Sequence, residues 1–358
     1  MILRAISWLR PSDNVRRELE AAVIALLVAV AIGSVLMLIV GKSPGHVWSQ
    51  MLIHVFTESY WFGYLLYRAT ALALTGLAVA IALEAGMFNI GAEGQLTAGV
   101  LACAVIGTAI PAGTPAFLAI PICLLGAALA GGAVGAAIGY LRVARDAHEV
   151  ITSIMLNSIV AGVALYIGNI ALFQGGTTTG AQIAPGAQLP LLGLGGSSAN
   201  VALVISVLAV ASVWWLRART TWGMAWLAVG RDAAAARSVG INVGRVRVLA
   251  MAGSGALAGL AAANFVLGHK HAFEEGLGRG TGLLGISVAL LGRTHPAGVA
   301  IAALLLGFLS AGGLSVAQEV PKELIEMLQG VVVLAVACAG PWVRRKPVPV
   351  AAPVEEAS

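Results

Sequence analysis

The residues with the greatest potential for chemistry are a few polar side chains embedded in long apolar runs. Glu93 is the sharpest case, because a carboxylate at the centre of a membrane helix costs about 2.5–3.5 kcal/mol and normally faces a cavity or a partner. Gly91 and Gly94 on either side free the backbone, and the exposed peptide groups of a broken helix can line a polar path. Two interpretations stay open: Asn89, Glu93 and Gln95 border a translocation route, or Glu93 caps a helix N-terminus.

Asn157 and Ser158 form a second polar pair inside a later apolar run. An asparagine there can hydrogen-bond across helices, a contribution of about 0.6 kcal/mol on average, so the default interpretation of Asn157 is structural. The other interpretation places the pair on the same route as Glu93. Glu84, at the end of the preceding run, and Glu93 are also the two acids that an ion- or proton-coupled carrier would use.

Three patterns typical of enzymes or metal proteins fail on their spacing. Residues 41–43 read Gly-Lys-Ser like the end of a phosphate loop, but Leu36 stands where its first glycine belongs and a membrane span precedes it. The histidines and glutamates between His269 and Glu275 have mixed spacing, which favours a solvated loop over a metal site. No Gly-x-Ser-x-Gly elbow occurs. We therefore expect neither catalysis, nor a bound cofactor, nor a metal in this chain.

The composition indicates an integral membrane protein. Hydrophobic residues make up 59% of the 358 and charged residues 10%, where a soluble domain has roughly a quarter charged. The 45 glycines suit helices that approach closely in lipid. Three cysteines, all within apolar runs, argue against a disulfide framework. The net charge of +5 is interpreted as a topological feature and not as affinity for nucleic acid.

The apolar runs predict an all-α polytopic protein of about ten transmembrane helices. Spans are expected at about 21–40, 62–84, 95–111, 115–141, 149–173, 200–216, 248–268, 281–292, 297–313 and 326–341. The run at 281–292 is short for a full crossing. A polar lead at 1–20 precedes this membrane domain of 21–341, and a tail at 342–358 is expected to be disordered.

The distribution of charge fixes the expected orientation. An even number of spans puts both termini on one side, and 16 of the 21 Lys and Arg residues then lie in the cytoplasm. Two glycine-punctuated stretches, Gly86–Gly99 and Gly276–Gly292, lie about five spans apart. An odd offset would invert the second copy, which predicts inverted-repeat-like halves.

A hydrophilic interruption at 217–247 carries six arginines against the single acid Asp232. Asp232 is a good N-cap, Ala233–Ala236 are strong helix formers, and Gly240 suits the left-handed position after a helix. The predicted helix has about seven residues and a length of about 10 Å, so it needs a surface to dock on. The simpler interpretation is a cytoplasmic loop retained inside by its positive charge.

Four motifs together carry a resemblance to a known family. They are GMFNIGAEGQ at Gly86–Gln95, MLNS at Met155–Ser158, VGRD to GI at Val229–Ile241, and GISVALLG at Gly285–Gly292. The chain resembles permease subunits of bacterial ABC importers, type II-like, in the branched-chain amino acid and simple-sugar permease family. The resemblance covers about 21–341, and the first two motifs are most similar to those of nucleoside permeases.

The resemblance implies that the 217–247 loop holds a coupling helix that docks into a groove of a cytoplasmic ABC ATPase. The residues implied in that contact are Arg231, Asp232, Ala235, Arg237 and Gly240. Arg231 stands where related chains usually carry Asn or Glu. ATP and Mg²⁺ would bind to the ATPase and not to this chain. The other implied partners are an extracytoplasmic substrate-binding protein and a second permease, with a heterodimer favoured over a homodimer.

The expected function is therefore that of a non-catalytic translocation subunit in a bacterial inner membrane, with both termini cytoplasmic and nucleosides as substrate. Simple sugars and branched-chain amino acids are the alternative substrates of the same machine, and a secondary carrier is the alternative class. The residues expected along the route are Asn89, Glu93, Gln95, Asn157 and Ser158.

Overall fold

The computed structural model describes residues 24, 27–28, 30–173 and 177–344. The described residues belong to two compact units, one spanning 45–319 and the other made of the residues before Gly45 and after Glu319. The expected polar lead at 1–20 and residues 345–358 of the expected tail lie outside the described residues. In the second unit, α14 (Lys322–Arg344) coincides with the last expected span and continues into the first residues of the expected tail.

The protein is all-α and polytopic, as predicted. Within the described residues, seven helices are long and apolar enough to cross a membrane, or up to eight if Val30–Ile39 and Pro44–Thr57 (α3) count as one span. The seven are α4 (Ser59–Glu84), α5 (Ala92–Ala109), α6 (Ala116–Arg145), α7 (Glu149–Ile167) with the π-helix η2 (Gly168–Leu172), α8 (Ala202–Arg219), α11 (Val243–Leu260) with the π-helix η4 (Ala263–Lys270), and α13 (Pro296–Ser315).

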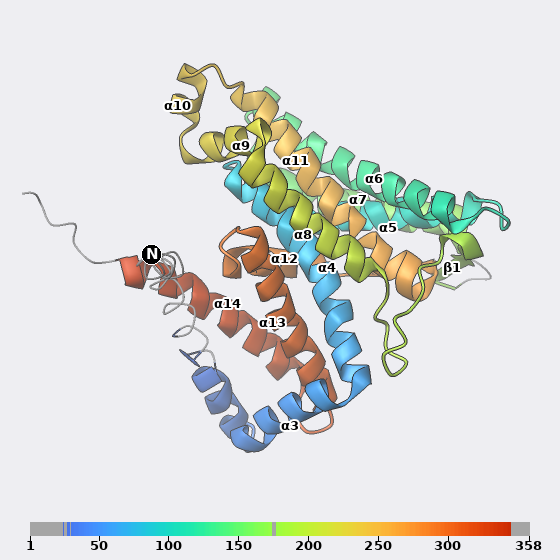
Figure 1. Ribbon diagram of the computed structural model, residues 1–358, viewed down its shortest axis with the longest axis vertical. Coiled ribbons are helices and arrows are strands. Elements are labelled where there is room, and N and C mark those ends of the chain that lie inside the picture. The colour runs from blue at the N-terminus through green and yellow to red at the C-terminus, as the bar shows by residue number, and fades with distance from the viewer. Residues whose placement is uncertain (1–23, 25–26, 29, 174–176, 345–358) are drawn as a thin grey trace, which may run out of the picture. The chain divides into compact units, whose positions relative to one another are not determined.

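The predicted count of ten spans is not confirmed. The run expected at 281–292 forms α12 (Thr281–Leu291), whose 11 residues rise only about 16 Å, well short of a hydrocarbon core of about 30 Å. α12 is instead a short rod that packs against α4, α5 and α13 inside the larger unit (Figure 1). It therefore lies where a full span was expected but does not have the length of one.

Small residues bring three helices into backbone contact, as the high glycine content predicts. Gly131 and Gly135 of α6 face Gly255 and Gly259 of α11, and a Cβ on any of the four would overlap the backbone of the other helix. Gly99 of α5 meets Gly259 in the same way. In lipid, where association depends on close packing, this interface fastens α5, α6 and α11 into one block.

α4 and α7 occupy opposite kinds of environment in this unit. Along its apolar window α4 is 89% buried, and it packs against α8, α11, α12 and α13. The window of α7 is only 11% buried, although this helix also reaches α5 and α6. α4 is therefore the central helix, while α7 leaves most of its surface for lipid or another chain.

Both glycine-punctuated stretches are irregular, as predicted, and they meet in space. The first breaks the chain between α4 and α5, with Gly86 at a φ of 71°. The second precedes α12 and has Gly276, Gly278 and Gly280 at φ values of 75°, 79° and 82°. A Cβ on Gly282 would overlap the backbone of Glu93, so the starts of α5 and α12 touch. The inverted relation between the two halves stays a prediction.

A two-stranded ribbon was not predicted from the sequence. β1 (Thr179–Gln182) pairs antiparallel with β2 (Ala272–Glu274), and a 3₁₀ turn, η3 (Pro185–Ala187), follows β1. The ribbon ties the α7–α8 connection to the segment between η4 and α12. In Figure 1, β1 lies at the opposite end of this unit from α10 (Ala233–Ser238).

Candidate functional site

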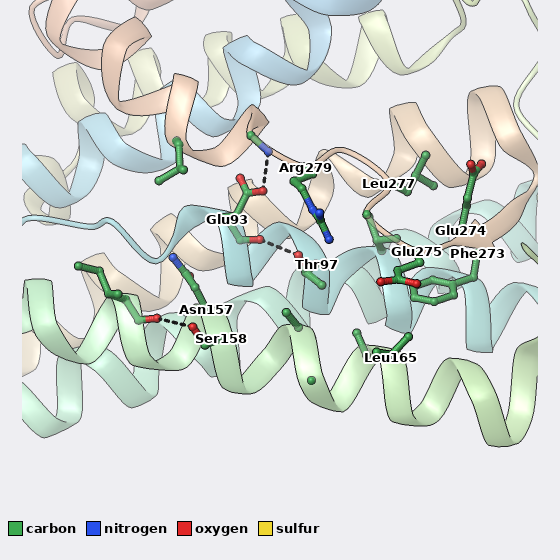
Figure 2. Close-up of a pocket in the computed structure, with 18 of the residues that line it drawn as sticks. Glu93, Thr97, Asn157, Ser158, Leu165, Phe273, Glu274, Glu275, Leu277 and Arg279 are labelled. Carbon is green, nitrogen blue, oxygen red and sulfur yellow. Dashed lines mark hydrogen bonds between the residues drawn. The ribbon is translucent and has the colours of Figure 1, made fainter. Parts of the chain in front are cut away.

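A cavity of about 720 Å³ lies between α5, α7 and the segment that leads into α12. This volume is within the range of about 300–1,000 Å³ typical of small-molecule sites. Its polar or charged lining residues are Glu93, Thr97, Asn157, Ser158, Glu274, Glu275 and Arg279. Apolar side chains including Leu165, Phe273 and Leu277 complete the wall (Figure 2).

Glu93 lies in the first turn of α5 and caps a different helix. Its Oε1 accepts a hydrogen bond from the Gly280 amide at 2.6 Å, and its Oε2 accepts one from the Gly282 amide at 2.9 Å. These amides lie at the start of α12, so the carboxylate faces the partial positive charge of two helix N-termini at once. The predicted capping role is therefore present, but it joins α5 to α12. Glu93 also lines the cavity, so its two predicted interpretations are compatible.

Asn157 fastens α7 to the irregular connection before α5. Its Oδ1 accepts a hydrogen bond from the Gly94 amide at 2.8 Å, and its Nδ2 donates to the Ile90 carbonyl at 3.0 Å. The side chain makes the cross-helix contact expected of it and also borders the cavity. Ser158 beside it is exposed, and its hydroxyl has only a long 3.4 Å contact with the Ile154 carbonyl.

Asn89 and Gln95, two of the residues expected along the route, do not line this cavity. Both are completely buried and bonded to each other, at 2.9 Å and 3.2 Å. Asn89 also donates to Ser254 of α11 at 2.7 Å and accepts from the Gly91 amide at 2.8 Å. Their polar groups bond within the protein and hold the α4–α5 connection against α11.

The cavity wall opposite α7 was not predicted from the sequence. Arg279 lies in the glycine-punctuated stretch before α12, and Figure 2 shows its side chain directed between Glu93 and Glu275. Glu274 is bound to Lys270 at 2.8 Å. Glu275 is exposed, as expected of a solvated loop, and it also lines the cavity. The glycines flanking Arg279 were the only indication in the sequence.

The free polar groups of the cavity suit binding of a small polar solute. Both oxygens of Glu93 are occupied by backbone amides. Asn157 bonds to Gly94 and Ile90, and the Thr97 hydroxyl donates to the Glu93 carbonyl at 2.9 Å, so these two side chains keep only their second hydrogen or remaining lone pairs for a ligand. Ser158, Arg279 and Glu275 are the lining groups most available to one. Across the part of the chain that the structure describes, no three His, Cys, Asp or Glu side chains are grouped to hold a metal ion. The chemistry available here is recognition by donors and acceptors.

The arginine-rich interruption contains the predicted short helix. In α10, Asp232 Oδ1 accepts from the Ala234 and Ala235 amides at 2.8 Å and 3.0 Å, and Gly240 has a φ of 85°. The six observed residues agree with the expected length of about seven. The preceding helix α9 (Thr221–Arg231) was not predicted, although Thr220, whose hydroxyl accepts from the Gly223 amide at 3.1 Å, is a recognisable N-cap.

α10 is displayed on the surface. The five residues implied in ATPase contact are all exposed: Arg231, Asp232, Ala235, Arg237 and Gly240. Ala236 is buried on the inner side, while the apolar Val239 is 76% exposed. Figure 1 shows α9 and α10 beyond the end of α8, at one end of this unit. The segment from Arg231 to Gly240 therefore presents two cations and the apolar side chain of Val239 at the surface.

A buried carboxylate lies beneath this loop. The Glu84 side chain, 6% exposed, accepts from Arg217 Nε at 2.8 Å and from Trp226 Nε1 at 3.3 Å. The Thr294 hydroxyl lies 3.4 Å from its Oε1. Burial, and secondarily the Arg217 cation, lowers the pKa of His295 below 6.5, while Glu84 acts to raise it. The sequence identified Glu84 as a candidate coupling acid but gave no indication of these partners.

Comparison with known proteins identifies relatives over most of the chain. Residues 62–337 match the family described as branched-chain amino acid transport system / permease component. A guanosine ABC transporter permease protein of Bacillus subtilis is 36% identical, covering 89% of this chain and 93% of that protein. A glucose ABC transporter permease protein of Haloferax volcanii is 33% identical over 87% and 85%. A nucleoside ABC transporter permease protein of Lactococcus lactis is 28% identical over 91% and 92%.

Proposed function

This chain belongs to the family of permease components of the branched-chain amino acid transport system, and we propose that it is the translocation subunit of an ATP-driven nucleoside importer. The observation that carries the proposal is the cavity at the junction of α5, α7 and α12, which combines a small-molecule volume with an amide, hydroxyls and a cation. The similarity to guanosine and nucleoside permeases supports the substrate class.

A nucleoside presents the complement of this lining. Its base carries amide-like donors and acceptors, which suit Asn157 and Arg279, and its sugar hydroxyls suit Ser158 and Thr97. An arginine binds O6 and N7 of a guanine base through two donors. A simple sugar would use only part of these groups, and the Haloferax relative keeps it as the alternative substrate. Branched-chain amino acids are the other alternative, on the family description alone.

The energy for transport would come from a separate cytoplasmic ATPase that holds ATP and Mg²⁺. α10 is the proposed docking element, since its cap fixes a short helix whose outer face is exposed. The exposed Val239 would fill an apolar pocket of the partner, and Arg231 and Arg237 would pair with its acids. ATP binding would move this element, and the cavity would open to alternate sides of the membrane.

The complete transporter would contain two further components. Two different guanosine permease proteins of Bacillus subtilis resemble this chain, as do two nucleoside permease proteins of Lactococcus lactis, which supports a heterodimer of permeases. The sparsely buried α7 leaves a surface for that second chain. A binding protein outside the cell would deliver the substrate. The predominance of arginine on one side supports a bacterial inner-membrane location with both termini cytoplasmic.

The proposal is tested by uptake into right-side-out membrane vesicles that carry this chain with its neighbouring transport subunits and that can be loaded with ATP on the inside. Labelled guanosine, glucose and leucine would be compared with and without ATP. ATP-dependent guanosine uptake is the expected result, and uptake of glucose or leucine alone would replace the substrate. Uptake that needs no ATPase and collapses with an uncoupler at constant ATP would contradict the importer and indicate a secondary carrier.

A further inference from the structure

The carboxylate of Glu84 lies where the end of α4 meets the end of α8 and the helix α9. Arg217 belongs to the end of α8 and Trp226 to α9, and both donate to it. The backbones are equally close, because a Cβ on Gly230 of α9 would overlap the Glu84 carbonyl. α9 leads directly into α10 through Asp232. Any displacement of α10 by a docked partner therefore acts first on these contacts.

α12 extends between this cluster and the cavity. Its N-terminal amides, Gly280 and Gly282, are held by Glu93, and the turn that follows its C-terminus places Thr294 3.4 Å from Glu84. The helix between is a rod of about 16 Å. Arg293 and Thr294 in that turn both have positive φ values, 52° and 58°, which non-glycine residues rarely adopt. The two ends of α12 thus meet two glutamates on either side of the α4–α5 connection, Glu84 at the end of α4 and Glu93 at the start of α5.

We infer that Glu84 is a positioning residue of the transport cycle, which transmits movement of α9 and α10 to α4 and α12. α12 then carries the movement to Glu93 at the cavity. The inference rests on the proposed function, because it needs an ATPase docked on α10. One carboxylate here contacts residues of α8, α9 and the α12–α13 turn, so these three elements are linked through a single side chain of α4.

The energetics of a buried pair agree with this role. Glu84 is buried and Arg217 partly so, and because taking charges out of water is unfavourable, such a pair often contributes little net stability. Removing one partner leaves the other charge uncompensated, which alters how firmly the joined elements hold together. Substitution at Glu84 should therefore change the link between the elements more than it changes the fold of each.

The test measures ATP hydrolysis and guanosine uptake together in vesicles that hold the complete transporter. Glu84→Gln preserves the size of the side chain and removes its charge. We expect hydrolysis to continue while guanosine transported per ATP falls about tenfold or more, as loss of a charged hydrogen bond predicts. The matched control is Glu149→Gln, which breaks the Arg142–Glu149 pair of 3.2 Å between α6 and α7. The control should keep its transport per ATP within about twofold of wild type.

A Glu84→Gln transporter with the wild-type ratio would overturn the inference, and so would an equal loss of hydrolysis and uptake, which indicates a structural role. If this variant fails to insert, Trp226→Phe decides, because it removes one donor to Glu84 and keeps an aromatic side chain. A lowered ratio in Trp226→Phe supports the inference and an unchanged ratio overturns it. The proposed function fails separately, if the wild-type transporter shows no ATP-dependent uptake.

Discussion

Glu84 and Glu93 are the same residue type, nine residues apart, yet they are held in different ways. Glu84 binds the side chains of Arg217 and Trp226, which belong to other helices. Glu93 binds the backbone amides of Gly280 and Gly282, which are fixed parts of α12. A contact between side chains can lengthen and reform as helices move, whereas a capped helix start loses its cap if the carboxylate leaves. The contact of Glu93 with α12 is therefore expected to persist, and we call it the fixed joint. The contacts of Glu84 with α8 and α9 are expected to change as these helices move, and we call them the adjustable joint.

The largest effect is expected for Glu93→Ala, which tests the fixed joint. The substitution leaves the Gly280 and Gly282 amides without their acceptor, and each unsatisfied buried donor costs about 1–3 kcal/mol. We expect a lower melting temperature of the purified chain and loss of uptake together. Thermal unfolding in detergent and vesicle uptake measure the two effects.

Glu93→Gln is the control for this substitution. Its amide oxygen still accepts one hydrogen bond, so about half of the lost stability should return. A Glu93→Ala chain that melts like wild type and loses only uptake would contradict the structural joint. That result would make Glu93 a residue that acts on the solute directly.

A second large effect is expected on the side of Glu84, in the loop above it. Asp232→Pro removes the Asp232 amide, which bonds to Ala228 at 3.0 Å, and cannot adopt the observed φ of −154°. Gly240→Val places a β-branched residue at a φ of 85°. Uptake should be abolished in both variants, while insertion and melting stay near wild type because the loop is exposed.

Asp232→Asn is the matched control, since asparagine caps a helix as well as aspartate does. Uptake by this variant should stay close to that of wild type. Normal transport by either the Asp232→Pro or the Gly240→Val chain would show that α10 does not couple to the ATPase. In that case no movement of α10 would reach the contacts of Glu84 with α8 and α9.

Features determined by local sequence could be predicted well. The apolar runs gave the positions of the long helices, and Asp232 with Gly240 gave both ends of α10. The two glycine-punctuated stretches were also recognisable as breaks. Each of these depends on neighbouring residues, through periodicity, capping or a positive φ, so the chain itself contains the information.

Features that depend on distant partners could not be predicted. Nothing near Asn89 or Gln95 shows that Ser254 of α11 would help to bury them. The donors to Glu84 come from more than 130 residues away, and Arg279 reaches the cavity only because the β-ribbon positions its segment. The segment of α12 was expected to be a transmembrane span because a short apolar run has the same sequence pattern in a span and in a short buried helix.

Asn157 and Ser158 allow the joint at Glu93 to be separated from solute recognition. Asn157→Ala removes two bonds to the α4–α5 connection, so it should lower both stability and uptake, the latter about tenfold. Ser158→Ala removes a hydroxyl that only lines the cavity, and it should raise the KM for guanosine no more than about fivefold without a change in melting. Equal effects of the two substitutions would contradict this division.

An effect as modest as that of Ser158→Ala is expected for Arg279→Met, which tests whether Glu93 or Arg279 recognises the solute. Because the amides of α12 occupy both oxygens of Glu93, recognition by a charged group is left to Arg279 and Glu275, of which only Arg279 is a cation. We expect the KM for guanosine uptake to rise about fivefold, with little change in maximal rate or melting. Arg279→Lys should recover part of the loss, since it restores the charge without the paired donors. Lys270→Met is the control, because it removes a cation bound to Glu274 from the same segment and should leave KM unchanged. The two roles would be reversed if KM were unaltered in Arg279→Met and raised in a Glu93→Gln chain that melts normally. Glu93 would then be the residue that recognises the solute.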